Sequence, residues 1–154
     1  MKIKVCGLKS VEEVECASKA GADYVGFVFY NPSPRGISYE LGKSLCQVTP
    51  KGVSRVALVI NPDEAMLESL KAIDFDFLQL HGSETVERVK EVKEALQLPV
   101  IKSVGVEVRS DLHLVDLYSS VADQILIDAK APVNSSLPGG NGICFNWDIL
   151  EGYN

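Results

Sequence analysis

The feature that most limits how this sequence can fold is an alternation of short apolar segments with amphipathic segments, repeated six times. The apolar segments read as β-strands whose two faces are both apolar, and they recur roughly every 20 to 30 residues. Such strands, alternating with helices, are typical of a parallel sheet that helices cover. The six predicted strands are residues 3–6, 22–29, 55–60, 75–80, 99–104 and 124–128.

The amphipathic segments carry the start and stop signals of helices. Ser10 and Glu13 have the spacing of a capping box, and Gly21 is placed to end the first helix. The stretch 61–64 (Asn-Pro-Asp-Glu) predicts a helix that Asn61 caps, with Pro62 in its first position and acids in its first turn. The predicted helices are 10–19, 38–47, one beginning at 61, 84–96, 111–118 and a short one at 146–150.

Composition fits one globular domain over residues 1–154, with 46% apolar and 23% charged residues. A net charge of −6 argues against a nucleic-acid partner, which would need a basic face. No apolar run approaches the length of about 18 residues that suggests a membrane span, so we expect no membrane contact. The opening residues 1–5 turn polar too early for a signal peptide, which favours a cytoplasmic location.

The four cysteines, Cys6, Cys16, Cys46 and Cys144, are widely scattered, and neither histidine stands at ligand spacing from them. We therefore expect no metal site and reduced thiols. Cys16 and Cys46 fall on predicted helices and read as core or helix-packing residues. Cys6, taken alone, also reads as a small buried residue, because free cysteines are among the most buried residue types.

Two α/β architectures compete for this pattern. A doubly wound sheet would usually place a glycine-rich dinucleotide turn after its first strand, whereas here a single glycine, Gly7, follows Cys6. A (β/α)8 TIM barrel predicts polar residues at the carboxyl ends of many strands, all facing one mouth. Polar residues of this kind are Cys6, Gln79, His81, Lys102, Ser103 and Asp128, with Arg35 in a fifth loop. They favour the barrel, of which the chain holds about the first six βα units.

Five motifs occur in the order and spacing of one known family: 4–8 (KVCGL), 31–38 (NPSPRGIS), 79–82 (QLHG), 127–128 (ID), and 138–142 (PGGNG) with 145–147. By these motifs the chain resembles the phosphoribosylanthranilate isomerases, (β/α)8 enzymes of tryptophan biosynthesis. The resemblance implies an Amadori rearrangement of N-(5'-phosphoribosyl)anthranilate, an aminoaldose, to an aminoketose, with neither a metal nor an organic cofactor. It also implies a phosphosugar–anthranilate as the small-molecule partner.

The resemblance further implies roles for individual residues. Cys6 would be the general base that removes the C2 proton, and Asp128 the general acid that protonates the ring oxygen. Arg35 would hold the anthranilate carboxylate. Gln79 and His81 would line the mouth and bind substrate, although a structural hydrogen-bonding role fits them equally. Gly139 and Gly140 would belong to a loop that covers the substrate.

Each role also makes a demand on the surroundings of the residue. A thiolate needs positive charge nearby, which Lys4, Lys102 or the substrate imine could supply. Burial could raise the pKa of the Asp128 carboxyl, as suits an acid. Asp128 could instead cap a loop or pair with Lys130.

Compared with the family, the chain lacks a seventh and an eighth βα unit, which in the family carry the phosphate site. A fragment, a barrel completed by a homodimer partner or a C-terminal segment, and an inactive copy would each account for this. We expect little isomerase activity from these 154 residues alone, because the phosphate anchor would be absent. The alternatives are a barrel fragment that acts only in assembly and another sugar-phosphate isomerase or epimerase.

Overall fold

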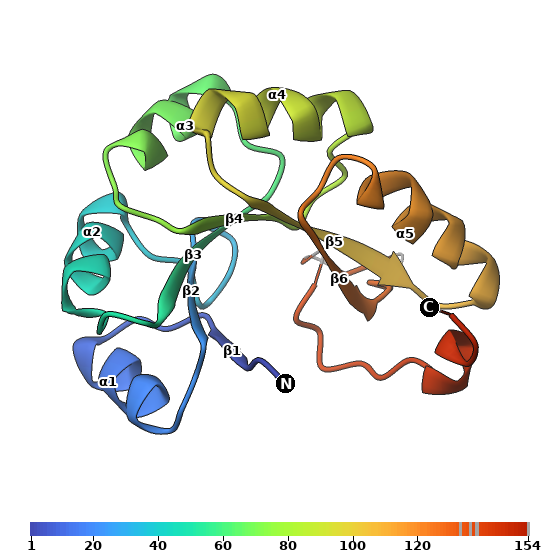
Figure 1. The fold of residues 1–154 in the computed structure, drawn as a ribbon, viewed down its shortest axis with the longest axis horizontal. Coiled ribbons are helices and arrows are strands. Elements are labelled where there is room, and N and C mark those ends of the chain that lie inside the picture. Colours follow the sequence, from blue (N-terminus) through green and yellow to red (C-terminus); the bar gives the residue numbers. More distant parts are fainter. Residues whose placement is uncertain (133, 136, 138, 154) are drawn as a thin grey trace.

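In the computed structural model, which describes residues 1–132, 134–135, 137 and 139–153, six parallel strands form a curved sheet (Figure 1). The strands follow one another in chain order, and every neighbouring pair is parallel. They are β1 (Lys4–Cys6), β2 (Tyr24–Val28), β3 (Ser54–Val59), β4 (Phe77–Leu80), β5 (Val100–Val106) and β6 (Gln124–Ala129). This arrangement is a half-barrel with six βα units, and it confirms the expected fold class.

The helices lie on the convex side of the sheet (Figure 1). They are α1 (Val11–Lys19), α2 (Tyr39–Val48), α3 (Glu64–Lys71), α4 (Val86–Leu96) and α5 (Leu112–Ser119), with 3-10 turns η1 (Arg109–Asp111) and η2 (Trp147–Leu150). The predicted bounds of the strands, and those of the helices other than α3, agree with the structure to within two residues.

The predicted start of α3 is wrong in one respect, because Asp63 and not Asn61 caps the helix. The Asp63 carboxylate accepts from the backbone N–H of Met66 at 2.8 Å. Asn61 adopts a left-handed conformation with φ of 45°, which asparagine tolerates better than most residues. Its side-chain oxygen instead accepts from the backbone N–H of Ser83 at 2.9 Å, so Asn61 joins two loops.

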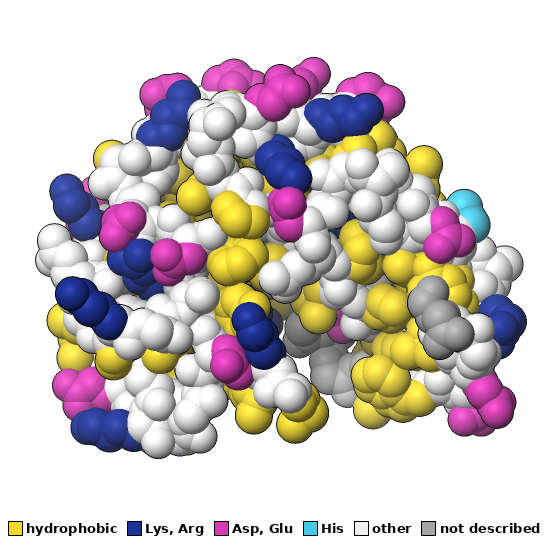
Figure 2. Space-filling model, in the orientation of Figure 1, with side chains coloured by type: hydrophobic (Ala, Val, Ile, Leu, Met, Phe, Trp, Pro, Cys, Tyr) yellow, Lys and Arg dark blue, Asp and Glu magenta, His cyan; other side chains and the backbone are white. Residues whose placement is uncertain are grey.

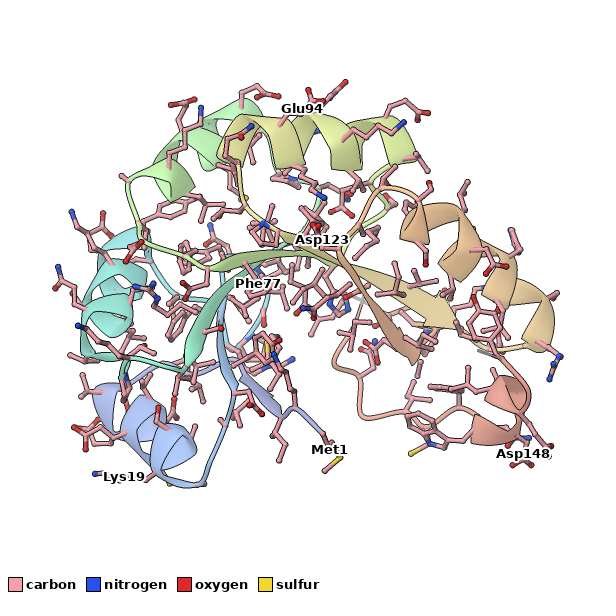
Figure 3. The ribbon with its side chains drawn as sticks, viewed as in Figure 1. Met1, Lys19, Phe77, Glu94, Asp123 and Asp148 are labelled. Carbon is pink, nitrogen blue, oxygen red and sulfur yellow. The ribbon has the colours of Figure 1, made fainter. Side chains whose placement is uncertain are left out.

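Apolar side chains on the convex face of the sheet form the main core beneath the helices. Sheet residues such as Phe27, Val59 and Leu78 are fully buried there. A smaller cluster lies on the concave face, where Tyr24, Val56 and Ile101 pack with the partly buried Phe77 (labelled in Figure 3). Both faces of the sheet are therefore apolar, as the sequence predicts.

The half-barrel is open between β1 and β6, the two outermost strands of the described sheet (Figure 1). A cavity of about 350 Å³ inside the curve is lined by Lys2, Lys4, Tyr24, Gln79, Ile101, Gln124, Ile125 and Leu126. Charged side chains gather along the helix-covered edge, while hydrophobic ones reach the surface near the opening (Figure 2). No helix in the described part of the chain is long and apolar enough to span a membrane.

Two cysteines on helices differ in their surroundings. Cys46 lies on the buried side of α2, as expected, and burial raises the pKa of its thiol to about 12. Cys16 is exposed on α1, so its assignment to the core is wrong. The reason is the helical period, which turns Val14 and Ala17 toward the sheet and leaves Cys16 facing outward.

Candidate active site

Cys6 lies at the carboxyl end of β1, and its side chain has room only because Gly26 stands opposite it. The two residues are register partners in β1 and β2. A Cβ atom on Gly26 would lie 2.8 Å from Cys6 Sγ and 3.0 Å from Lys4 Nζ. The thiol and the ammonium group therefore occupy the space that a side chain at Gly26 would take. Cys6 is only partly buried, which leaves the thiol accessible from the half-barrel.

Lys102 and Ser103 lie on opposite faces of β5, because side chains alternate along a strand. Ser103 Oγ lies on the concave side, in contact with Gln79 and His81. Lys102 is 2% exposed and packs against Tyr118 of α5 on the convex side. Lys102 is thus not a mouth residue, and of the two lysines considered as a source of positive charge near Cys6, Lys4 is the one beside it.

Asp128 is the second-last residue of β6 and faces the concave side, next to His81 in the loop after β4. His81 Nε2 lies 3.3 Å from Asp128 Oδ2, and the backbone N–H of Ala129 donates to Oδ1 at 2.9 Å. The hydrogen bond from His81 lowers the pKa of Asp128 and outweighs burial, which acts in the opposite direction. The expected rise in this pKa is therefore wrong. Lys130 instead lies 3.6 Å from Asp111.

Two side chains on the concave face of the sheet contact the other ring nitrogen of His81. His81 Nδ1 lies 3.0 Å from Gln79 Nε2 and 3.1 Å from Ser103 Oγ. Nδ1 thus faces Gln79 and Ser103, while Nε2 faces Asp128. Gln79 is 1% exposed, and its Oε1 has no hydrogen-bond partner among the described residues. Gln79 thus orients His81, and its contact with substrate stays a prediction.

Arg35, His81, Gly139 and Gly140 come together around a small cavity. This cavity, of about 40 Å³, is lined by Val28, Tyr30, Ser33, Arg35, Leu58, Ile60, His81, Leu137, Gly139 and Gly140. Gly140 lies directly against Arg35 Nη2, and Gly139 lies against His81 Nε2, so neither position leaves room for a side chain. Four of the predicted substrate-binding residues thus share one site, while Pro138 of the same motif lies outside the described residues.

A larger cavity of about 310 Å³ lies on the other side of His81. It is lined by Ile60, Asn61, His81, Gly82, Ser83, Ser103, Gly105, Asp128, Ala129, Lys130 and Ala131. Sequence reasoning did not assign Asn61 to the site, although its position just after the third predicted strand could have indicated it. His81 and Ile60 line both this cavity, which we call the Asp128 cavity, and the smaller one, which we call the Arg35 cavity. No three His, Cys, Asp or Glu side chains in the described part of the chain could together hold a metal ion.

Comparison with known proteins shows which family this chain is similar to. Residues 3–154 match the model of the family described as N-(5'-phosphoribosyl)anthranilate (PRA) isomerase. An N-(5'-phosphoribosyl)anthranilate isomerase of Ruegeria sp. (strain TM1040) is 45% identical over 97% of this chain and 70% of its own length.

Two solved structures resemble the half-barrel. Phosphoribosylanthranilate isomerase from Thermotoga maritima superposes with a TM-score of 0.85 at 33% identity, covering 97% of this chain and 70% of that one. A phosphoribosylanthranilate isomerase in complex with reduced 1-(o-carboxyphenylamino)-1-deoxyribulose 5-phosphate gives a TM-score of 0.77 at 33% identity, covering 84% and 65% of the two chains.

Proposed function

This chain belongs to the N-(5'-phosphoribosyl)anthranilate isomerase family, and we propose that within its single domain of residues 1–154 Cys6 and Asp128 carry out the proton transfers of the isomerase reaction. The reaction is a step of tryptophan biosynthesis that converts an aminoaldose to an aminoketose. The observation that carries the proposal is that Cys6 and Asp128 lie at the carboxyl-end regions of two strands of one parallel sheet and both face its concave side. A base and an acid at these two positions can act on one sugar held across the mouth.

The ring-opening step needs a proton at the furanose oxygen. Asp128 donates it while the C1–O bond breaks and the anthranilate nitrogen shares its lone pair with C1, which gives a protonated imine. The lowered pKa of Asp128 means that this carboxyl is ionised when the site is free. Asp128 must therefore take up a proton before it can donate one, and His81, whose Nε2 lies 3.3 Å from Asp128 Oδ2, stands where it can relay that proton.

The second step removes the proton from C2. The Cys6 thiolate takes it, the C2–H electrons form a C1=C2 bond, and the C=N electrons return to nitrogen, which leaves a neutral enol. C1 then takes up a proton, and the C2 hydroxyl loses its proton to solvent as its O–H electrons form the C2=O bond, which gives the aminoketose. Lys4 Nζ shares with Cys6 the space opposite Gly26, so an ammonium group lies beside the sulfur.

Arg35 binds the anthranilate carboxylate in this proposal. Its side chain lies between Gly7 and Gly140, because a Cβ on Gly7 would lie 2.5 Å from Arg35 Cδ and Gly140 lies against Nη2. A planar guanidinium can pair with both oxygens of a carboxylate. The Arg35 cavity adjoins His81, so the aromatic acid would lie next to the acid–base pair.

The test compares the chain itself with a hybrid that appends the C-terminal part of the Ruegeria relative beyond the matched region. Consumption of N-(5'-phosphoribosyl)anthranilate and formation of the aminoketose are followed by NMR. We expect turnover in the hybrid, weak turnover in the 154-residue chain, and a loss of at least about 1,000-fold in kcat for Cys6→Ala and for Asp128→Asn, as suits removal of an acid or a base. Unchanged turnover in both variants would refute the assigned roles.

A further inference from the structure

A buried ion pair on the convex face of the sheet stands directly behind the active site. Lys102 Nζ of β5 lies 3.0 Å from Glu84 Oε2, in the loop before α4, and their side chains are 2% and 0% exposed. Tyr118 of α5 covers the pair, with its ring centroid 5.2 Å from Lys102 Nζ and its hydroxyl donating to the Glu84 carbonyl at 2.8 Å. Neither charge faces the concave side of the sheet.

Lys102 uses all three of its N–H donors within this environment. Besides Glu84, it donates to the carbonyl of Gly82 at 2.8 Å and to the carbonyl of Ser103 at 2.9 Å. Gly82 follows His81 in the chain, and Ser103 contacts His81 Nδ1 through its hydroxyl. One ammonium group therefore holds the backbone of Gly82, the residue after His81, and that of Ser103, whose side chain contacts the His81 ring.

Glu84 holds the same loops through its carboxylate. Its Oε1 accepts from the backbone N–H of Asn61 at 2.8 Å, and both of its oxygens accept from that of Gly82 at 3.1 Å. A Cβ on Gly82 would lie 2.7 Å from Glu84 Oε1, so the glycine permits this close approach. The carboxylate thus joins the loop after β3 to the loop after β4, and both loops line the Asp128 cavity.

We propose that Lys102 and Glu84 are positioning residues, which fix the loop of His81 from the convex side of the sheet and so set the contact between His81 and Asp128. This inference rests on the proposed function for its catalytic consequence, but its structural part stands without it. Replacing a buried ion pair by apolar residues is often neutral or stabilising, so stability alone gives little reason for two charges at this place. Besides pairing with each other, they bond to the backbone of Asn61, Gly82 and Ser103, which holds the segments around His81 in place.

The experiment uses the chain with Lys102→Met and follows the Asp128 carboxyl by carbon-13 NMR as pH is varied. His81 is the main cause of the lowered pKa of Asp128. Displacement of His81 must therefore raise the pH at the midpoint of the Asp128 titration. We also expect the backbone amide hydrogen of Gly82 to exchange with solvent at least about tenfold faster. The double variant Lys102→Met with Glu84→Gln leaves neither charge of this pair buried without its partner. If the single variant does not fold, the midpoint of the Asp128 titration is measured in the double variant instead.

Arg55→Met is the matched control, because it removes another ion pair of this sheet. Arg55 donates to Asp76 at 2.8 Å at the start of β3, the opposite end of the strands from the mouth. We expect this variant to lose stability without moving the Asp128 midpoint. An unchanged midpoint in a folded Lys102 variant, or an equal shift in Arg55→Met, would overturn the proposal.

Turnover separates this inference from the proposed function. We expect kcat of the hybrid to fall about tenfold in Lys102→Met while KM changes by less than about twofold, because the acid–base pair and not the carboxylate site is disturbed. If the Asp128 midpoint rises but the unmodified hybrid shows no isomerase activity, the positioning role stands and the proposed function fails. If turnover is normal and the midpoint does not move, the positioning role fails alone.

Discussion

His81 Nε2 lies 3.3 Å from Asp128 Oδ2, and this contact joins the loop after β4 to the end of β6 across the concave face of the sheet. It is the dominant influence on the ionisation of Asp128. It also connects the two cavities of the site, since His81 lines both and Asp128 lines the larger one. The contact therefore joins the cavity that Arg35 lines to the cavity that Asp128 lines.

The first prediction concerns His81→Asn. Removing the imidazole removes the group that lowers the pKa of Asp128, while the burial that raises it remains, so we expect the carboxyl to titrate at higher pH. The measurement is the carbon-13 shift of Asp128 against pH. His113→Asn is the matched control. His113 is the second histidine of the sequence and lies on α5, where its ring contacts the Ser110 carbonyl away from the site. A midpoint that stays in place would contradict the role of the contact.

The second prediction concerns Gly26→Ala. The added methyl would press on Cys6 Sγ and Lys4 Nζ, so we expect slower reaction of Cys6 with a thiol reagent and a loss of roughly 1–3 kcal/mol in the free energy of unfolding. The reaction rate is measured with the other three cysteines replaced by serine. Gly42→Ala is the control, since its methyl would meet Phe29 Cζ at 2.6 Å on the convex side. It should destabilise the chain and leave the thiol rate unchanged.

The third prediction concerns Arg35→Ala and binding of the reduced aminoketose phosphate that is bound in one solved relative. Loss of a charge-assisted, bidentate contact costs about 1.5–3 kcal/mol, so we expect the dissociation constant to rise roughly 10- to 150-fold. Isothermal titration calorimetry provides the measurement. Lys51→Ala removes an equal charge from an exposed turn and should bind as the unmodified chain does. Equal losses in both variants would mean that overall charge, and not Arg35, determines binding.

The fourth prediction concerns pH-dependent stability at the base of the sheet. Arg55 donates to both oxygens of Asp76, at 2.8 and 2.9 Å, and this lowers the pKa of Asp76. The stabilisation is therefore present at pH values above the unfolded-state pKa of about 4 and is lost as the pH falls through the lower folded-state pKa. We expect Asp76→Asn to cost about 1 kcal/mol at pH 7, because the pair is partly exposed, and almost nothing near pH 2. Urea unfolding at the two pH values measures this, and an equal cost at both would contradict it.

Sequence alone determined the order, type and approximate bounds of the elements, because these depend on interactions between near neighbours. The apolar segments and the caps at Ser10 and Ser38 were sufficient for that. Sequence also indicated Cys6 and Asp128, since the end of a parallel strand can be located from its pattern, and it indicated Arg35 through the family motif of residues 31–38. It placed Asn61 wrongly as a cap, because two suitable residues, Asn61 and Asp63, stand within one turn.

Only the tertiary structure decided which way the polar residues of β5 face. A strand that is apolar on both sides has no alternation to reveal its inner face, so Lys102 and Ser103 could not be distinguished. The contact of His81 with Asp128 and the pairing of Lys102 with Glu84 join segments far apart in the chain. Such contacts depend on the order and curvature of the whole sheet, which no local pattern encodes. One of these contacts, that with His81, lowers the pKa of Asp128, so the sequence alone could not predict the direction of this pKa shift.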